Sequence, residues 1–344
     1  MICIHCRTDA KYKDREGGKC SSCGHAFAFE PKAGAPLTDA AFASALAHVS
    51  SDGKVKWTEN YLYYEVARRL QKKASVVVPL LAGAVAFALS WVTGAWPIGV
   101  VAAVFWAAAA RALVKNAAPS IVLPPGSFHQ LLLAWVRAHG EPAGRIVRKP
   151  LPESPRPLPA DVPEYSFDRA VVCDRSETVD LLLANRFHFE NNCAVLSVDG
   201  YPPQAFETVR AMLKRNPKLV VYALHDATLE GCSLARRLAT SPAWFLGGAR
   251  VIDVGISPRH ARRFKGLWTP VLPRGAALAG ATADDAWLAR YSLGLAVIRP
   301  EQVIKRLFRA ISGTPDALTV GLSTDAVAFA EDATVSDGGG DSFG

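Results

Sequence analysis

The stretch AVVCDRSETVDLLLANRFH, residues 170–188, places a short β-branched run directly before an amphipathic segment of helical length. This alternation recurs along the chain and predicts strands over 170–173, 194–198, 219–224 and 250–254, with helices over 177–185, 205–214 and 229–239. Strands that alternate with helices at this spacing are typical of βαβ units, in which the strands are parallel. The sequence therefore predicts a C-terminal α/β domain with a parallel sheet over residues 167–312.

Polar residues follow three of the predicted strands at their carboxyl ends, where parallel sheets present loops to ligands. Asp174 follows the first strand, and Asp199 opens a Gly-Tyr-Pro turn after the second. The third strand is followed by His225, Asp226 and Thr228. Carboxylates that meet at one edge of a sheet can bind a hard cation such as Mg²⁺. The same residues equally fit a structural role, because Asp174 and Thr228 stand where helix N-caps are expected.

Three segments resemble a known family. AVVCDRSETVDLLLANRFH (170–188), AVLSVDGYPP (194–203) and VVYALHDATLEG (220–231) are similar, in order and spacing, to the Toprim domain of the topoisomerase VI A subunit family. The resemblance covers residues 169–240, about a fifth of the chain, and implies a Toprim-like fold with a magnesium site. Strand passage is excluded for this chain alone, because residues 115–149 are too few for the family's nucleophile-bearing domain and contain no tyrosine.

The residues that the resemblance assigns to Mg²⁺ depart from the family pattern. Asp174 stands in place of the family's glutamate, Asp226 matches the first aspartate after the third strand, and Thr228 stands in place of the second. Glu177 and Glu230 lie close by in sequence and are the candidate replacement ligands. The resemblance therefore implies a degenerate site, with Asp174 and Asp226 as its first candidate catalytic residues.

Four of the seven cysteines form two close pairs near the N-terminus, Cys3 and Cys6 followed by Cys20 and Cys23. The spacing C-x2-C-x13-C-x2-C is typical of zinc ribbons, in which four thiolates hold a tetrahedral Zn²⁺ ion. Because four protein ligands leave no open position, we expect this Zn²⁺ to be structural. His5 and His25 stand beside the pairs, and we expect the cysteines alone to bind the metal. Residues 1–30 are therefore predicted to form a zinc ribbon.

An uncharged run extends over residues 74–110, and as one helix it would measure about 55 Å against a bilayer core of about 30 Å. The break TGAWP (93–97) divides the run into spans over 74–92 and 97–114. Basic residues flank both outer ends, which places both termini and both soluble domains in the cytoplasm. The sequence thus predicts a two-helix transmembrane hairpin over 74–114 in the cytoplasmic membrane, with the lipid bilayer as a partner. The alternative is a buried hairpin inside a large soluble domain.

Small residues at helical spacing in both predicted spans favour close packing of helices. The packing could join the two helices of one hairpin or the hairpins of neighbouring copies, so homo-oligomerisation is one expectation. Residues 31–73 are predicted to be a linker and an amphipathic helix, which either lies along the bilayer or extends the first span into the cytoplasm. Residues 115–166 are predicted to hold a juxtamembrane helix over 128–139 and a proline-rich linker. Residues 313–344 are predicted to be a flexible tail.

The densest basic cluster outside the predicted membrane flanks consists of Arg259, Arg262, Arg263 and Lys265. This cluster suits nucleic-acid phosphates or anionic headgroups, and it equally suits an ordinary solvated face. We expect Cys173, Cys193 and Cys232 to be small core residues. The alternative for Cys232 is a nucleophile beside His225.

Composition limits the class of function. The chain has 344 residues, 50% of them hydrophobic, and its net charge of +8 excludes an acidic or generally disordered protein. The leading hypothesis is a membrane-anchored cytoplasmic binding or scaffold protein, whose zinc ribbon and Toprim-like domain bind a nucleic acid, a nucleotide or a protein partner. One alternative is a Mg²⁺-dependent nuclease or phosphotransfer enzyme in DNA processing or anti-phage defence. The other is a structural subunit of a membrane complex.

Overall fold

A four-stranded sheet forms the centre of the C-terminal part. The computed structural model describes residues 1–9, 11–15, 17–71, 105, 123–147, 167–216, 218–245, 248–271 and 282–313. The sheet consists of β1 (Arg169–Cys173), β2 (Ala194–Ser197), β3 (Val220–Leu224) and β4 (Arg250–Asp253). Its strands are all parallel and lie in the order β2-β1-β3-β4. The predicted parallel sheet is confirmed.

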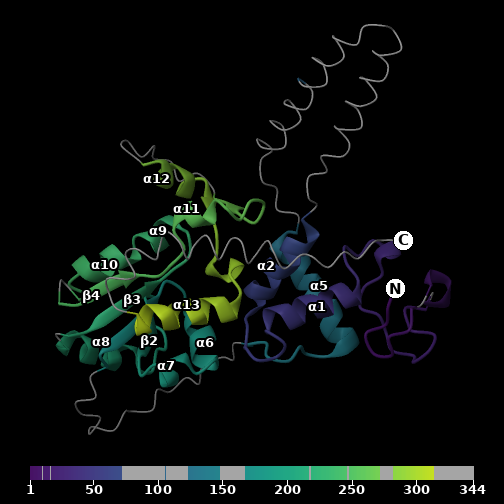
Figure 1. Ribbon diagram of the computed structural model, residues 1–344, viewed down its shortest axis with the longest axis horizontal. Helices are drawn as coiled ribbons and strands as arrows, with labels where there is room; N and C mark the ends of the chain where they lie inside the picture. Colours follow the sequence, from purple (N-terminus) through teal and green to yellow (C-terminus); the bar gives the residue numbers. More distant parts are fainter. Residues whose placement is uncertain are drawn as a thin grey trace.

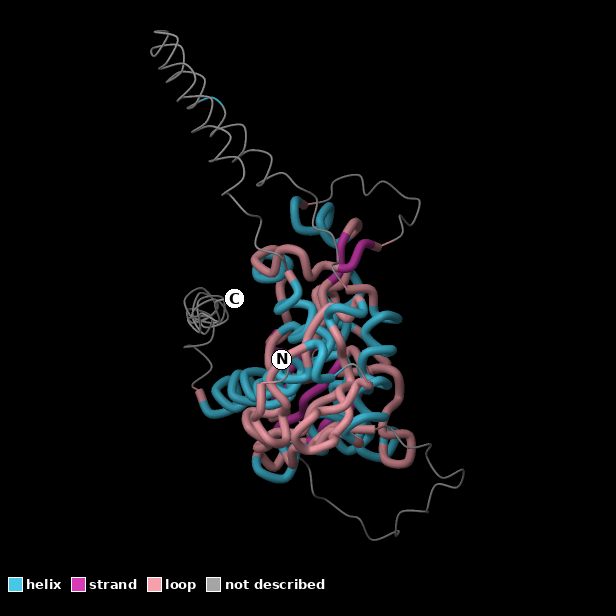
Figure 2. Tube along the Cα trace, turned by 90° about the vertical axis from the view of Figure 1, so that its right-hand side faces the viewer, coloured by secondary structure: helices cyan, strands magenta, loops and turns pink. Residues whose placement is uncertain are grey.

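Helices pack against this sheet and continue the chain after it (Figure 1). Those that connect its strands are α6 (Ser176–Ala184), α7 (Phe187–Glu190), α8 (Phe206–Arg215), α9 (Leu229–Cys232) and α10 (Leu234–Thr240). The helices after β4 are α11 (Pro258–Ala261), α12 (Ala283–Leu288), η3 (Leu295–Val297) and α13 (Pro300–Ser312). A short antiparallel pair joins β5 (Thr269–Pro270) to β6 (Tyr291–Ser292). Figure 2 shows this pair and α12 apart from the four-stranded sheet.

The N-terminal part is helical. Its elements are η1 (Tyr12–Arg15), η2 (Pro31–Ala33), α1 (Asp39–Val49), α2 (Glu59–Leu70) and α5 (Pro125–His139). The helix expected over 128–139 lies within α5. Figure 1 shows α1, α2 and α5 side by side, with the N-terminal cysteine segment beyond them and away from the sheet.

Successive residues of β1 point to opposite faces of the sheet, so that a core forms on each face. On one face, Ala170 and Val172 belong to a core with residues of α8 and α10. On the other face, Val171 and Cys173 belong to a larger core with residues of α6 and α13 and of the N-terminal helices α1, α2 and α5. The N-terminal helices and the sheet therefore share one hydrophobic core.

The helix α2 lies inside this shared core. Tyr61, Leu62 and Val66 are buried. Two hydrogen bonds also join α2 to the C-terminal part. The Tyr64 hydroxyl oxygen accepts from the Gly294 N–H at 3.1 Å, and an Arg68 N–H donates to the Val297 carbonyl oxygen at 2.7 Å. The helix expected to lie along a bilayer or to extend a membrane span is thus covered by protein, because its apolar face packs on the C-terminal domain.

The predicted fold class and localisation are corrected at one point. Within the described ranges, no helix has the length and apolar character needed to cross a membrane. The longest helices with residue bounds above are α5 and α13, with 15 and 13 residues, and a spanning helix needs about 20 apolar residues. The prediction of a two-helix transmembrane hairpin, and of the cytoplasmic-membrane localisation that rested on it, is therefore wrong for the described chain. The spans 74–92 and 97–114 themselves lie outside the described residues, apart from Phe105.

Two further predicted segments lie outside the described residues. The prolines of the predicted linker, from Pro150 to Pro163, are among them, and so is the tail predicted over 313–344, apart from Gly313. Residues 31–73, predicted as linker and amphipathic helix, contain η2, α1, α2 and most of the buried N-terminal side chains.

Candidate functional site

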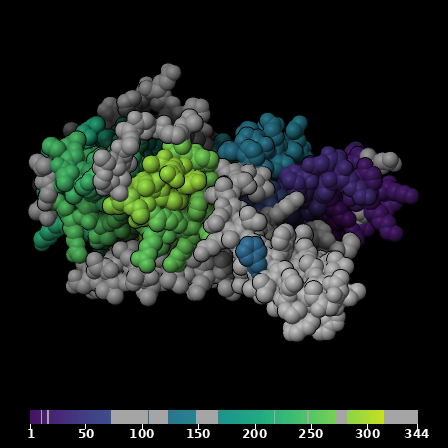
Figure 3. Space-filling view, turned by 90° about the horizontal axis from the view of Figure 1, so that it is seen from above, coloured from purple at the N-terminus to yellow at the C-terminus, as the bar shows by residue number. Residues whose placement is uncertain are grey.

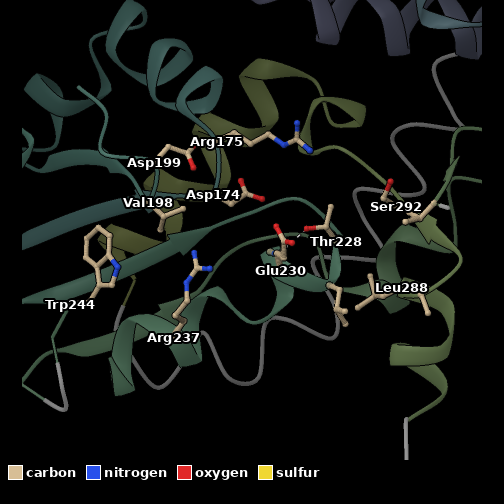
Figure 4. A pocket seen from close by; sticks show the side chains of 14 residues that line it. Asp174, Arg175, Val198, Asp199, Thr228, Glu230, Arg237, Trp244, Leu288 and Ser292 are labelled. Carbon is tan, nitrogen blue, oxygen red and sulfur yellow. Dashed lines mark hydrogen bonds between the residues drawn. The ribbon is translucent and has the colours of Figure 1, made fainter. Parts of the chain in front are cut away.

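The carboxyl ends of β1, β2 and β3 lie level, because Cys173 pairs with Ser197 on one side and with Leu224 on the other. The loops after these strands, together with α10, α12 and β6, enclose a pocket of about 690 Å³. The charged side chains that line this strand-end pocket are Asp174, Arg175, Asp199, Glu230 and Arg237. In Figure 4 the side chains of Asp174, Glu230 and Arg237 point into the same space, with Trp244 at one end and Leu288 at the other.

The two carboxylate oxygens of Asp174 differ in their hydrogen bonding among the described residues. Its Oδ2 accepts a hydrogen bond from the Asp226 N–H at 2.8 Å. Its Oδ1 is buried and has no hydrogen-bond partner in the part of the chain that the structure describes. Burial, and then the charge of Asp226, raise the pKa of Asp174 to about 6. Carboxyl groups with such shifts concentrate at functional sites, which supports Asp174 as a site residue.

Asp226 lies next to Asp174 but faces the protein interior. Its side chain is only 5% exposed, and it forms an ion pair with the Arg175 guanidinium. Its Oδ1 also accepts a hydrogen bond from the Leu295 N–H at 2.6 Å. Asp226 is not among the residues that line the pocket. The structure thus brings Asp174 and Asp226 together, while both oxygens of Asp226 have protein partners.

Thr228 caps α9, as the structural reading of the sequence expected. Its Oγ1 accepts a hydrogen bond from the Gly231 N–H at 2.8 Å. A Cβ atom on Gly231 would lie 2.5 Å from the Asp226 carbonyl oxygen and 2.8 Å from Thr228 Oγ1. Glycine is therefore required at this position by the close approach of α9 to the end of β3.

The two remaining acidic candidates have different surroundings. Glu177 on α6 faces α2, where it accepts hydrogen bonds from the Thr58 hydroxyl and, at 2.6 Å, from the Asn60 amide. Glu230 on α9 lines the strand-end pocket. The structure therefore places Glu230 with Asp174 and places Glu177 elsewhere.

Arg237 and Trp244 were not predicted as site residues. Arg237 lies on α10, seven residues after Glu230, and both side chains line the pocket. Trp244 packs edge-on against Phe206 of α8, with ring centroids 5.8 Å apart. Arg210 lies over the Trp244 ring at 5.9 Å from its centroid. A spacing of seven residues corresponds to two helical turns, which places two side chains on the same face of a helix. This spacing was the signal in the sequence that could have indicated that Arg237 and Glu230 lie on one side of the predicted helix over 229–239.

His225 is buried, and both of its ring nitrogens are hydrogen-bonded. Its Nδ1 donates to the Asp226 carbonyl oxygen at 2.7 Å, and its Nε2 donates to Asp253 Oδ1 at 2.9 Å. Burial lowers the pKa of His225, but its hydrogen bonds, with that to Asp253 the largest, outweigh burial and raise the pKa to about 10. Cys232 lies on α9 beside His225, and its Sγ donates to the Ile256 carbonyl oxygen at 3.9 Å.

The four N-terminal cysteines form a second candidate site. Their sulfur atoms all lie within 4.8 Å of one another, a geometry that can hold a metal ion such as zinc. Arg7 and Gly24 each follow a cysteine pair with positive φ, and each donates its N–H to the carbonyl of the first cysteine of that pair. The two pairs therefore have the same local turn, although one uses arginine where the other uses glycine. His5 and His25 stack on each other, with ring centroids 3.7 Å apart.

The cysteine segment is attached to the helices through Asp39. This carboxylate at the start of α1 is fully buried and accepts hydrogen bonds from the N–H groups of Ala28 and Phe29, both at 2.9 Å. His139 at the end of α5 also contacts it, with Nε2 at 2.7 Å from Oδ2. The segment after the fourth cysteine is therefore fixed to both α1 and α5.

The basic cluster on and after α11 divides in the structure. Arg262 forms an ion pair with Asp284 at 2.6 Å and donates to the Ala283 carbonyl oxygen at 2.7 Å, both at the start of α12. Arg259, Arg263 and Lys265 are exposed. Three of the four predicted anion-binding residues thus remain at the surface.

No family model matches the chain, and no curated protein or solved structure is significantly similar to it. The resemblance to the Toprim domain gains no support from these comparisons. What the structure does provide is a parallel sheet with a charged pocket at its carboxyl edge and a four-cysteine cluster compatible with a zinc ribbon.

Proposed function

We propose that this chain is a binding protein whose strand-end pocket holds a nucleotide. The observation that carries the proposal is that Arg237 lines the same pocket of about 690 Å³ as the carboxylates of Asp174 and Glu230. A nucleotide has an anionic phosphate, hydroxyl donors on its sugar and a flat base. The pocket offers a suitable surface for each of these three parts.

Arg237 is the proposed phosphate ligand. Its side chain is exposed, lines the pocket and forms no ion pair with any residue that the structure describes. A guanidinium group binds phosphate through two parallel N–H···O bonds, which makes arginine well suited to phosphate recognition. Trp244 closes this end of the pocket, so that a phosphate here is partly shielded from water.

Asp174 and Glu230 are the proposed partners of the sugar. A carboxylate accepts hydrogen bonds, and carboxylates that hydrogen-bond ribose hydroxyls are a recurring device at the carboxyl ends of parallel strands. The unpartnered Oδ1 of Asp174 is an acceptor suited to such a donor. The apolar side chains of Leu229, Val271 and Leu288 line the pocket as well, and they are the proposed contacts of the base.

The test is calorimetric titration of the full chain with ATP, ADP, AMP and inorganic phosphate. We expect a nucleotide to bind, and we expect Arg237→Gln to weaken its binding at least about tenfold, equivalent to about 1.4 kcal/mol. Arg236→Gln is the matched control, since Arg236 lies on the same helix and does not line the pocket. Equal affinity of the Arg237→Gln variant and the unaltered chain would contradict the proposal.

Mg²⁺-dependent cleavage of phosphoesters is the competing function. The buried, unpartnered oxygen of Asp174 favours it, because Mg²⁺ is often held by one or two carboxylates together with substrate phosphates. Against it, Asp226 is already paired with Arg175, and Thr228 caps a helix in place of a third carboxylate. Incubation of the full chain with labelled DNA and RNA, with and without Mg²⁺, separates the two functions. If the full chain cleaves nucleic acid only with Mg²⁺, and Asp174→Asn abolishes the cleavage, the chain is a Mg²⁺-dependent enzyme.

We also propose that the four-cysteine site binds Zn²⁺ with a structural role. Four thiolates in a closed cluster leave no position for a substrate, and sulfur ligands select zinc over Mg²⁺. Metal analysis of the purified chain is the test. Zinc is expected at one ion per chain, and Cys20→Ser is expected to lose it, whereas Cys232→Ser is expected to retain it.

A further inference from the structure

The strand-end pocket has an acidic side, formed after two neighbouring strands. Asp199 follows β2 and Asp174 follows β1, and these strands are adjacent in the sheet. Both side chains line the pocket. Asp199 accepts a hydrogen bond from the Ser197 hydroxyl at 3.3 Å, which leaves its negative charge in place. Figure 4 shows the two carboxylates on one side of the pocket and the Arg237 guanidinium on the other.

The pocket offers few cations to a phosphate chain. The described residues that line it include two arginines, Arg175 and Arg237. Arg175 already forms an ion pair with the buried Asp226. The basic N-terminal segment is remote, since Figure 3 shows its purple atoms at the opposite end of the molecule from the green and yellow atoms of the C-terminal part. Among the described lining residues, Arg237 is therefore the arginine that remains for a phosphate.

Trp244 limits the space beyond Arg237. Its side chain lines the pocket at the end opposite Leu288, and the residue is only 8% exposed. Arg210 lies 5.9 Å from the centroid of the Trp244 ring but does not line the pocket, and it pairs with Glu207 at 2.5 Å. A second phosphate beyond Arg237 would therefore meet an apolar ring and no unpaired cation of the described lining residues.

We infer that the strand-end pocket selects a nucleoside monophosphate over nucleotides with longer phosphate chains. This inference rests on the proposed nucleotide function of the same pocket and names its ligand class. If the inner phosphate of a diphosphate binds Arg237, the outer phosphate meets Trp244. If the outer phosphate binds Arg237, the inner phosphate lies toward Asp174 and Asp199. Neither arrangement gives the added negative charge a cation, and the second places like charges close together in a partly buried site, where they repel strongly.

The experiment is calorimetric titration of the full chain with AMP, ADP and ATP in buffer without added divalent cations, which would screen the phosphate charge. AMP is expected to bind at least about tenfold more tightly than ADP, and ADP at least as tightly as ATP. Asp199→Asn removes the charge and keeps an oxygen that can accept from Ser197. This variant is expected to reduce the ratio of AMP affinity to ADP affinity at least about threefold.

The matched control is Glu190→Gln, because Glu190 is an exposed acid on α7 that does not line the pocket. It should leave the affinity ratio unchanged, and circular dichroism checks that both variants are folded. If none of the three nucleotides binds, the proposed function fails and the inference fails with it. If ADP binds as tightly as AMP, the proposed function stands and the inference alone is overturned. A ratio that Asp199→Asn leaves unchanged also overturns the inference, because selection would then not come from the acidic side.

Discussion

Glu65 on α2 is the centre of a buried charge cluster, and this cluster gives a stability prediction with a defined pH window. Its side chain is 6% exposed, and Oε1 lies 2.8 Å from His48 Nδ1 and 3.0 Å from Arg69 Nε. Arg68 lies 3.4 Å from the other carboxylate oxygen. Burial raises the pKa of Glu65, but the hydrogen bond from His48 and the charges of His48, Arg68 and Arg69 outweigh burial and lower the pKa to about 2.

The substitution Glu65→Gln removes the charge and keeps the shape. A carboxyl whose folded pKa lies below its usual value of 4.5 stabilises the folded state fully above pH 4.5, and this stabilisation is lost as the pH falls through the folded pKa. The difference of about 2.5 pKa units corresponds to about 3 kcal/mol at pH 7 and to about 1 kcal/mol at pH 3. We therefore expect Glu65→Gln to destabilise the chain strongly at neutral pH and only weakly at pH 3.

Urea unfolding at the two pH values measures this difference. A loss of about 3 kcal/mol moves the midpoint by about 1 M or more. The control is Glu207→Gln on α8, because Glu207 pairs with Arg210 at 2.5 Å but is 73% exposed, and exposed pairs contribute little. The reasoning is refuted if Glu65→Gln unfolds at the same urea concentration as the unaltered chain at pH 7. It is equally refuted by a loss at pH 3 as large as the loss at pH 7.

Two further predictions concern the strand-end pocket. Asp174→Asn is expected to raise the thermal midpoint at pH 7, because a carboxyl with a pKa raised to about 6 destabilises the fold once it ionises. The gain should fade as the pH falls below about 4, where the carboxyl is protonated in both states, and a gain that persists there would contradict this account. Gly231→Ala is expected to cost about 2 kcal/mol in urea unfolding, because the new Cβ would lie 2.5 Å from the Asp226 carbonyl oxygen. An unchanged midpoint would show that α9 can shift at no cost.

The sheet could be predicted from the sequence because its signals are local. Each strand is a short run of apolar, largely β-branched residues, and a helical period follows each run. Asp174 could be placed at the carboxyl edge for the same reason, since it comes directly after β1, and Glu230 was a candidate from its position on the helix that follows β3. These predictions needed only the order of elements along the chain.

Contacts between distant segments could not be predicted. Glu177 is held by Thr58, which lies 119 residues earlier, and Asp226 accepts a hydrogen bond from Leu295, which lies 69 residues later. The hydrophobic periodicity of a segment contains no information about which distant residue will contact it. As a result, the sequence offered Glu177 and Asp226 as free carboxylates, although both have protein donors.

The error about α2 has a related cause. The helical spacing of Tyr61 and Tyr64 correctly indicates one apolar face, but such a pattern shows only that a face is covered and not what covers it. Because a long uncharged run follows α2 in the sequence, a membrane was the partner expected to cover this apolar face. In the structure the cover is the segment around Gly294 and the side chains around β1.

The hydrophobic core that α2 shares with the sheet has a consequence for how the molecule unfolds. Segments that bury side chains in the same core lose their stability together, so that they behave as one cooperative unit. The backbone amides of α2 and β1 should therefore exchange with solvent deuterium at similar rates, both set by global unfolding. A chain cut between the helical part and the sheet would leave one face of β1 uncovered, and neither piece would then retain the fold of the whole.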